Sequence, residues 1–278
     1  MQPGRPAIRL IATDIDGTLV NDCGELTSAT VQVLRAVQER GVPVVLVTGL
    51  NPWPVERYVR QIGQGIRAIC LNGIFLLEDG RLSEGQFVAP EVAREAAQVA
   101  VDHGYVPLLF GEDRATRYLV PPTSEGAGEV ALLIAERPYQ PYLAVDTVDA
   151  LLAVRPAQLS VCDTPSRAAA LYPLLDEAVG ANAYVVYQPG KRAWVEVNHP
   201  AVRKDTALLA LAARLGCPAE AILYFGDSLN DLPVFRVLPH PVAVRNAHPD
   251  ILALAWDIAR GNNEEGVALY LSEFFGLE

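Results

Sequence analysis

Lysine is almost absent from this 278-residue sequence. Only Lys191 and Lys204 are lysines among the 22 basic residues, and the other 20 are arginines. A lysine ammonium is a compact point charge, whereas an arginine guanidinium is a planar fork, so the two are not interchangeable at a binding site. A lysine in such a chain can therefore mark a position that needs a point charge, with a solvated surface lysine as the ordinary alternative.

Cysteine pairs and long apolar runs are also missing. The four cysteines are scattered without C-x-x-C spacing, which predicts reduced thiols rather than a disulfide framework or a zinc site. No stretch approaches the roughly 20 apolar residues that span a bilayer, and the first residues lack the apolar core of a signal peptide. We therefore expect a cytoplasmic protein. The sequence carries no feature that predicts an oligomeric state.

Several function classes lack their signatures. There is no Gly-x-Ser-x-Gly elbow and no Walker loop, and the four histidines have no paired helical spacing. The formal net charge of -11 disfavours nucleic acid and acidic membranes as partners, because both would be repelled. A small anionic substrate stays possible, since one metal ion or one lysine can reverse the field inside a cleft.

Short apolar runs alternate with helical patterns at both ends of the chain, which predicts an α/β protein with a parallel sheet. Strands are expected at residues 7–13, 42–48, 66–71, 222–225 and 241–244. The turn Asp79-Gly80 resembles a hairpin that leaves this sheet, and mixed helix and strand patterns follow it. We therefore expect a discontinuous core domain at residues 1–82 and 191–278, with an inserted α+β domain at residues 83–190.

The segment Asp14-Ile15-Asp16-Gly17-Thr18-Leu19 follows the first expected strand. Ligands bind at the carboxyl ends of strands in open parallel sheets, so both carboxylates are well placed for catalysis. One carboxylate can attack phosphorus while its neighbour transfers protons. The ordinary alternative is a strand-to-turn junction, because Asp and Gly are both favoured in turns.

Two further segments could hold a phosphate group. Thr48-Gly49 closes the second expected strand with a hydroxyl and a backbone N–H, although such a pair is usually only a turn. Lys204 begins the helix that returns to the core, where its ammonium could neutralise a phosphate or a carboxylate.

A fourth segment, Gly226-Asp227-Ser228-Leu229-Asn230-Asp231, follows the expected strand at residues 222–225. Its aspartates are hard oxygen ligands of the kind that Mg²⁺ prefers, with a helix cap as the alternative. Carboxylates crowded beside a phosphate repel one another, and each like-charge pair at 4 Å costs about 4 kcal/mol at an effective dielectric near 20. The four segments together therefore predict a magnesium-dependent enzyme that acts on a small phosphorylated metabolite.

These four segments, in this order, resemble the motifs of the haloacid dehalogenase superfamily of phosphohydrolases. The position of the insertion resembles the Cof-type branch, which has a Rossmann-like three-layer core and a large α/β cap. The resemblance extends to Leu71-Asn72-Gly73, Arg245-Asn246-Ala247 and Asn263-Glu264-Glu265-Gly266-Val267-Ala268.

The resemblance implies a role for each motif residue. Asp14 resembles the nucleophile that becomes phosphorylated, and Asp16 the acid and base. Thr48, Gly49, Lys204 and Asn230 are implied to bind phosphate. The Mg²⁺ ligands are implied to be Asp14, the backbone carbonyl of Asp16, and Asp227, with Asp231 supporting them.

Two positions depart from the branch. Leu50 stands where arginine is usual and Asp205 where glycine is usual, which affects the expected substrate range rather than the chemistry. Lys191 and Arg192 could meet a second anionic group of the substrate, although a solvated loop is the alternative. A phosphomutase with the same nucleophile, or a non-catalytic sugar-phosphate binding protein, remains an alternative function.

Overall fold

The computed structural model describes residues 6–113, 115–121, 125–137 and 140–277, and the chain divides into two compact units. One unit contains Met1–Glu84 and Arg203–Glu278, and the other contains Gly85–Val202. We call them the core unit and the inserted unit. The chain returns to the core after Val202 rather than at the expected boundary of 190/191. The reason is that strand β11 (Ala193–Asn198) pairs with β9 (Pro156–Asp163) and β10 (Tyr184–Gln188) of the inserted unit.

The core unit is built on an eight-stranded sheet with the order β14-β13-β12-β1-β2-β3-β4-β5. The strands from β14 to β3 are parallel, and β4 and β5 form an antiparallel hairpin at one edge. Their bounds are β1 Leu10–Thr13, β2 Val44–Val47, β3 Arg67–Cys70, β4 Phe75–Glu78, β5 Arg81–Glu84, β12 Ile222–Gly226, β13 Pro241–Val244 and β14 Asp257–Ala259. The central strands are buried on both faces, as expected for a parallel sheet covered by helices.

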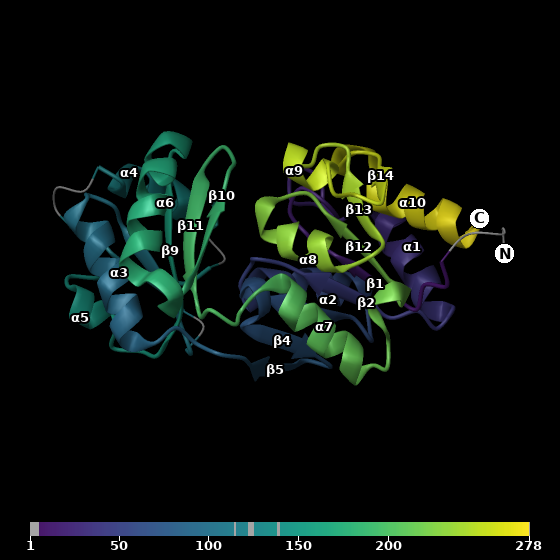
Figure 1. The fold of residues 1–278 in the computed structure, drawn as a ribbon, viewed down its shortest axis with the longest axis horizontal. Helices are drawn as coiled ribbons and strands as arrows, with labels where there is room; N and C mark the ends of the chain where they lie inside the picture. The colour runs from purple at the N-terminus through teal and green to yellow at the C-terminus, as the bar shows by residue number, and fades with distance from the viewer. Residues whose placement is uncertain (1–5, 114, 122–124, 138–139, 278) are drawn as a thin grey trace. The chain divides into compact units, whose positions relative to one another are not determined.

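Helices cover this sheet in two groups. Figure 1 shows α7 and α8 in front of the sheet and α1 behind it. Helix α1 packs against α2 and α10, whereas α8 packs against α7 and α9. The bounds are α1 Ser28–Glu39, α2 Pro52–Ile62, α7 Lys204–Arg214, α8 Leu232–Val237, α9 Pro249–Leu252 and α10 Gly266–Phe275. Short 3-10 turns are η1 Leu71–Gly73, η3 Ala219–Ala221, η4 Leu229–Asp231 and η5 Asn262–Glu264. The predicted α/β class is confirmed.

Local sequence explains where the core helices begin. Thr27 caps α1, and its hydroxyl accepts a hydrogen bond from the backbone of Thr30 at 3.1 Å. Asn51 caps α2 in the same way through the backbone N–H of Trp53 at 3.0 Å, and Pro52 occupies the first helical position. Both caps satisfy backbone donors that a helix start leaves without partners. The first turn of α2 therefore follows the Thr48-Gly49 loop directly.

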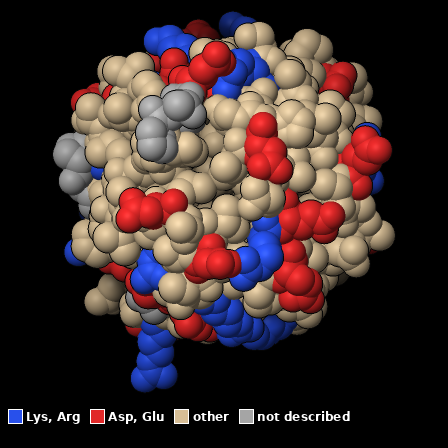
Figure 2. All heavy atoms as spheres, turned by 90° about the vertical axis from the view of Figure 1, so that its left-hand side faces the viewer, with Lys and Arg blue, Asp and Glu red and all other residues tan. Residues whose placement is uncertain are grey.

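The inserted unit has a six-stranded sheet with the order β10-β11-β9-β6-β7-β8, in which only β7 and β8 pair in parallel. Helices α3 and α6 pack on one face of this sheet over aliphatic side chains. The remaining bounds are α3 Pro90–Asp102, β6 Pro107–Gly111, β7 Thr116–Leu119, α4 Ala127–Glu136, β8 Tyr142–Val145, α5 Val148–Leu151, α6 Pro165–Val179 and η2 Gly180–Asn182. Figure 2 shows acidic and basic side chains interspersed on the side of the molecule that carries α3 and α5.

Membrane-spanning helices are absent from the described ranges: none of their helices is both long enough and apolar enough to cross a bilayer.

Candidate active site

The candidate site forms where β1 and β12 end side by side. These strands pair in parallel, with Thr13 opposite Phe225, and the backbone N–H of Asp14 donates to Phe225 at 2.8 Å. The loops that follow both strands therefore leave the sheet together. This pairing brings Asp14 to Asp227 although the two residues are far apart in the sequence.

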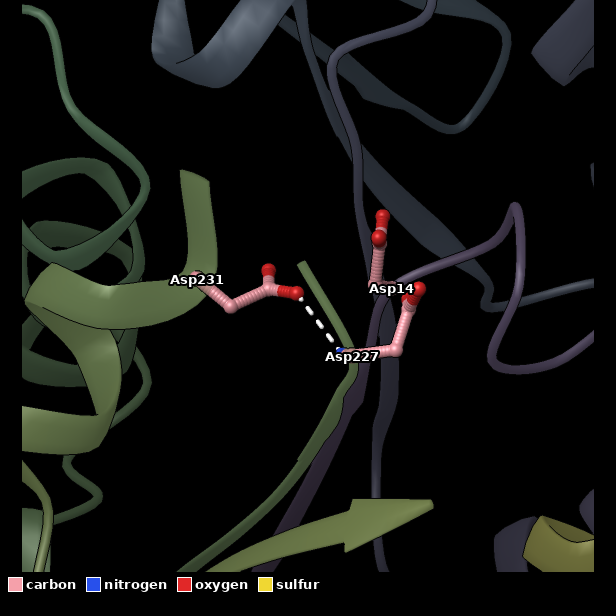
Figure 3. Close-up of side chains that lie close together, drawn as sticks. All are labelled: Asp14, Asp227 and Asp231. Carbon is pink, nitrogen blue, oxygen red and sulfur yellow. Dashed lines mark hydrogen bonds between the residues drawn. The ribbon is translucent and has the colours of Figure 1, made fainter. Parts of the chain in front are cut away.

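Three aspartates, Asp14, Asp227 and Asp231, gather at this edge (Figure 3). Each offers a carboxylate oxygen within 4.8 Å of the others. The donor set is entirely carboxylate oxygen, which suits Mg²⁺ or Ca²⁺ better than a metal that prefers sulfur or nitrogen. This group of aspartates could therefore hold a metal ion, as the fourth motif predicts.

Asp231 is anchored through both of its oxygens. Its Oδ1 accepts from the Lys204 ammonium at 2.7 Å and from the Tyr224 hydroxyl at 2.6 Å. Its Oδ2 accepts from the backbone N–H groups of Asp227 and Ser228, each at 3.0 Å. Four hydrogen bonds occupy most of what a carboxylate can accept. Asp231 thus shapes the loop and holds Lys204, which fits a supporting role better than direct metal binding.

Lys204 is the charge that joins these carboxylates. Its side chain is fully buried, and its ammonium lies 3.0 Å from Asp14 and 2.7 Å from Asp231. Burial alone would lower the pKa of Lys204, but the charges of Asp14 and Asp231 outweigh burial and hold the pKa above its ordinary value. The ammonium therefore stays protonated, and the alternative of a solvated surface lysine is wrong.

The two carboxylates nearest the strand ends bind protons unusually tightly. Burial raises the pKa of Asp14 well above its ordinary value, Lys204 opposes this effect, and the charges of Asp231 and Asp227 add to it. Burial and the charge of Asp231 also raise the pKa of Asp227 to about 7, although a hydrogen bond from Thr18 lowers it. Repulsion of this kind would be relieved by a bound cation.

Gly17 and Thr18 bring the backbone of the first loop against Asp227. A Cβ atom at Gly17 would lie 2.5 Å from Oδ2 of Asp227, and Gly17 has a φ of +72°. Only glycine meets both conditions without strain. The Thr18 hydroxyl donates to Oδ1 of Asp227 at 2.6 Å, which fixes the direction of that carboxylate.

Thr48 lies at the end of β2, the neighbour of β1, and is almost fully buried. Its hydroxyl oxygen accepts from the backbone N–H of Leu50 at 3.0 Å, so its proton can still be donated to a ligand. Gly49, between them, is half-buried. Asn230 is buried, and its side-chain amide donates to Asn72 at 3.2 Å. The backbone N–H of Asn72 in turn donates to the carbonyl of Thr48 at 3.0 Å, so η1 connects the second and fourth motifs.

Asp16, Lys191 and Arg192 lie outside the group of three aspartates. Asp16 is exposed two residues after Asp14, and its charge contributes to the raised pKa of Asp14. Lys191 and Arg192 belong to the inserted unit, where Lys191 is exposed. Arg192 forms ion pairs with Glu129, at 3.9 Å, and with Glu136, both on α4. The predicted substrate contact of these two basic residues stays a prediction.

The two departures from the branch have local structural consequences. Asp205 is 3% exposed and accepts from both Nε, at 3.0 Å, and Nη2 of Arg203. Such a paired arrangement between arginine and carboxylate offsets the cost of burying the charge of Asp205. The backbone of Leu50 contacts Thr48 and also accepts from Leu71 at 2.9 Å. Neither departure disturbs the contact between Lys204 and Asp14.

Tyr224, Thr18 and Asn72 were not assigned roles from the sequence. In the sequence, Tyr224 looks like one more residue of an apolar, buried strand. In the structure its hydroxyl donates a hydrogen bond to Asp231. Thr18 lies within the first motif and could have been noticed there. The buried contact between Asn72 and Asn230 depends on tertiary structure, so no local pattern reveals it.

Known proteins share both this fold and this sequence pattern. The model of the family described as haloacid dehalogenase-like hydrolase matches residues 11–271. A phosphoglycolate phosphatase of Methanothermobacter thermautotrophicus is 26% identical over 97% of this chain and 100% of its own length. The chloroplastic endoribonuclease YBEY of Arabidopsis thaliana is 26% identical over 95% of this chain, which spans only 46% of that longer protein.

Solved structures give the same result for the fold. A protein from Streptococcus mutans has a TM-score of 0.84 and 19% identity, with 97% of this chain and 99% of that chain covered. The resemblance predicted from the four motifs is therefore confirmed: the chain belongs to the haloacid dehalogenase-like hydrolase family.

Proposed function

We propose that this hydrolase is a magnesium-dependent phosphatase that hydrolyses a small phosphate monoester through a phosphorylated Asp14. The observation that carries the proposal is the buried contact of Lys204 with both Asp14 and Asp231, beside Asp227. The phosphatase class is supported by the family match and by relatives named as phosphatases. The nucleophile, the metal, the substrate and a cytoplasmic location are parts of the proposal.

Asp14 would attack the phosphorus atom of the ester. A carboxylate nucleophile divides the displacement into formation and hydrolysis of an aspartyl phosphate. The carboxylate must be ionised to attack, and the adjacent Lys204 ammonium favours that form against the effect of burial. Bonding to phosphorus forms the aspartyl phosphate while the ester oxygen leaves.

Asp16 would move the protons in both steps. Its exposed carboxylic acid would protonate the departing alcohol oxygen, and the resulting carboxylate would then remove a proton from water. Attack of this water on the phosphorus of the aspartyl phosphate releases inorganic phosphate and restores Asp14. Thr48, Gly49, Lys204 and Asn230 would hold the phosphate oxygens during these steps.

The carboxylate cluster fits Mg²⁺ by ligand type and by charge. Asp14, the backbone carbonyl of Asp16, and Asp227 would hold the ion, and Asp231 would support them. Bound Mg²⁺ would supply positive charge that offsets repulsion between the carboxylates and the phosphate. The Thr18 hydroxyl, which donates to Asp227, would hold that carboxylate in place for this purpose.

The substrate would be a small phosphorylated metabolite. The relative from Methanothermobacter thermautotrophicus is named for phosphoglycolate, which is a compound of this kind. The inserted unit would contribute to the choice of substrate. Its exposed Lys191 would bind a second anionic group of the substrate. Lys191→Ala should change the order of preference among phosphate esters, and an unchanged order would remove Lys191 from the proposal.

The test is a screen of phosphorylated metabolites with Mg²⁺, in which inorganic phosphate and isomerised products are both measured. We expect release of inorganic phosphate, and we expect Asp14→Asn to abolish it without unfolding the protein. Isomer formation without phosphate release would instead identify a phosphomutase. Binding of esters without turnover would identify a non-catalytic binding protein.

A further inference from the structure

The turn after β3 has an unusual backbone. Leu71, Asn72 and Gly73 have φ values of 45°, 55° and 123°, so three consecutive residues have positive φ. Glycine adopts such values freely and asparagine tolerates them, but leucine does so at a cost in free energy. Leu71 and Asn72 are each 2% exposed. A strained buried turn persists when the surrounding structure requires it, and such turns concentrate at functional sites.

The backbone of this turn is bonded to the loop that carries Thr48. Thr48 donates to the carbonyl of Ile69 at 2.9 Å, Leu71 donates to Leu50 at 2.9 Å, and Asn72 donates to the carbonyl of Thr48 at 3.0 Å. Turn η1 also packs against α7, the helix that begins with Lys204. The positive φ values thus direct consecutive N–H groups of the turn toward the phosphate-binding loop.

The side chain of Asn72 reaches a different motif. Its Oδ1 accepts from Nδ2 of Asn230 at 3.2 Å, and both residues are more than nine-tenths buried. Within the part of the chain that the structure describes, Oδ1 of Asn230 has no hydrogen-bond partner. An amide nitrogen carries two hydrogens, so Asn230 can donate one to Asn72 and still offer the other to a ligand.

We propose that Asn72 is a positioning residue that sets the Asn230 amide and the Thr48 loop for binding the phosphate group. This inference rests on the proposed function. Asn72 acts through its neighbours: its backbone N–H holds Thr48, and its side chain orients Asn230. The metal-binding carboxylates are held by other partners, namely Thr18 and Lys204. Loss of the Asn72 side chain should therefore weaken phosphate binding and leave Mg²⁺ binding unchanged.

Asn72→Gly is the decisive variant. Glycine accepts a φ of 55° and keeps the N–H that donates to Thr48, so the substitution removes what the side chain contributes, including its contact with Asn230. The readouts are KM for the best ester, the inhibition constant of inorganic phosphate, the Mg²⁺ concentration for half-maximal activity, and Tm. Asn182→Gly, at an exposed asparagine of the inserted unit, is the matched control.

We expect Asn72→Gly to raise KM and the phosphate inhibition constant about tenfold, the scale of one lost hydrogen bond, with the Mg²⁺ requirement unchanged. Asn182→Gly should change neither constant. A phosphate inhibition constant equal to that of the wild type would overturn the proposal. So would a parallel weakening of phosphate and Mg²⁺ binding with a lowered Tm, because that pattern indicates general loosening of the fold.

A double-mutant cycle tests whether Asn72 acts through Asn230. If it does, Asn72→Gly should add little to the effect of Asn230→Ala on the phosphate inhibition constant. Fully additive effects would contradict this route.

A chain without turnover would refute the proposed function but not this inference. Calorimetric titration of the Mg²⁺-loaded protein with inorganic phosphate would then test the positioning role of Asn72. Binding about tenfold weaker in Asn72→Gly supports the positioning role, whereas equal affinities, or a wild type that binds no phosphate, overturn it.

Discussion

Lys204 donates a hydrogen bond of 2.7 Å to Asp231, and both side chains are fully buried. The first residue of α7 is thereby joined to the loop after β12, and the same ammonium contacts Asp14 at 3.0 Å. A buried ion pair contributes little net stability compared with apolar residues, but breaking one by removing a single partner leaves an uncompensated charge. The site therefore depends on this lysine for its fold and, under the proposed function, for its chemistry as well.

Lys204→Met should destabilise the protein by about 3–5 kcal/mol in metal-free buffer, because Asp14 and Asp231 lose their cation. Phosphatase activity should be lost in the folded fraction. Chemical denaturation measures the first effect. Lys191→Met is the matched control, since Lys191 is the other lysine of the chain and is exposed. We expect the control to lie within about 0.5 kcal/mol of the wild type. Equal stability of the two variants would contradict the role of Lys204.

The raised pKa of Asp227, about 7, predicts how the metal-free protein responds to pH. The folded state holds a proton that the unfolded state, with a pKa near 4, has already released. This contribution to stability is complete below about pH 4 and is lost as the pH rises toward 7. Between about pH 4 and pH 7 the free energy of unfolding should fall by up to about 1.4 kcal/mol per pH unit. Chemical denaturation in EDTA from pH 5 to 8 measures it.

Asp227→Asn is the control for this pH dependence. The variant should lack the pH dependence of stability that Asp227 contributes. It should also be more stable than the wild type in EDTA at pH 8, where the wild type carries an extra negative charge on the partly buried Asp227. Identical pH profiles for the two proteins would show that Asp227 titrates normally.

Removal of the metal should abolish activity reversibly. Chelation should lower phosphate release at least about a hundredfold, because the charge that offsets the carboxylates is lost, and added Mg²⁺ should restore it. Mg²⁺ should also raise Tm, since it binds the folded state and not the unfolded chain. Full activity after exhaustive chelation would contradict the proposed metal site.

The thiols provide a test of the core packing. Cys23 is exposed, whereas Cys70, Cys162 and Cys217 are buried. Burial raises the pKa of Cys162 to about 12 and the pKa values of Cys70 and Cys217 in the same direction, so their reactive thiolates are scarce. A thiol reagent should label Cys23 quickly in the native protein and all four cysteines in denaturant. Rapid labelling of Cys70 in the native state would contradict the structure.

The sequence predicted the residues whose positions follow from strand ends. Asp14 and Asp227 meet because each directly follows one of two neighbouring parallel strands. Lys204 was identified by the rarity of lysine, and its burial agrees with that interpretation. The anchoring of Asp231 by Tyr224 was not predicted, because an apolar strand pattern does not distinguish a tyrosine whose hydroxyl meets a carboxylate.

Other features depend on interactions between distant segments. The boundary after Val202 is set by pairing of β11 with β9, and strand pairing cannot be read from a local apolar run. The positive φ of Leu71 could not be predicted from the sequence either, because leucine is not a residue type that favours left-handed turns. Hydrogen bonds from Leu71 to Leu50 and from Asn72 to Thr48 accompany that conformation, and both join segments that are distant in the sequence.

Direct detection of the phosphorylated side chain tests the central proposal. The protein would be mixed with its best ester and Mg²⁺, quenched in acid during turnover, digested, and examined by mass spectrometry. We predict a phosphoryl group on Asp14 that disappears when the substrate is exhausted. A phosphoryl group on another residue, or turnover without any phosphorylated peptide, would contradict the account.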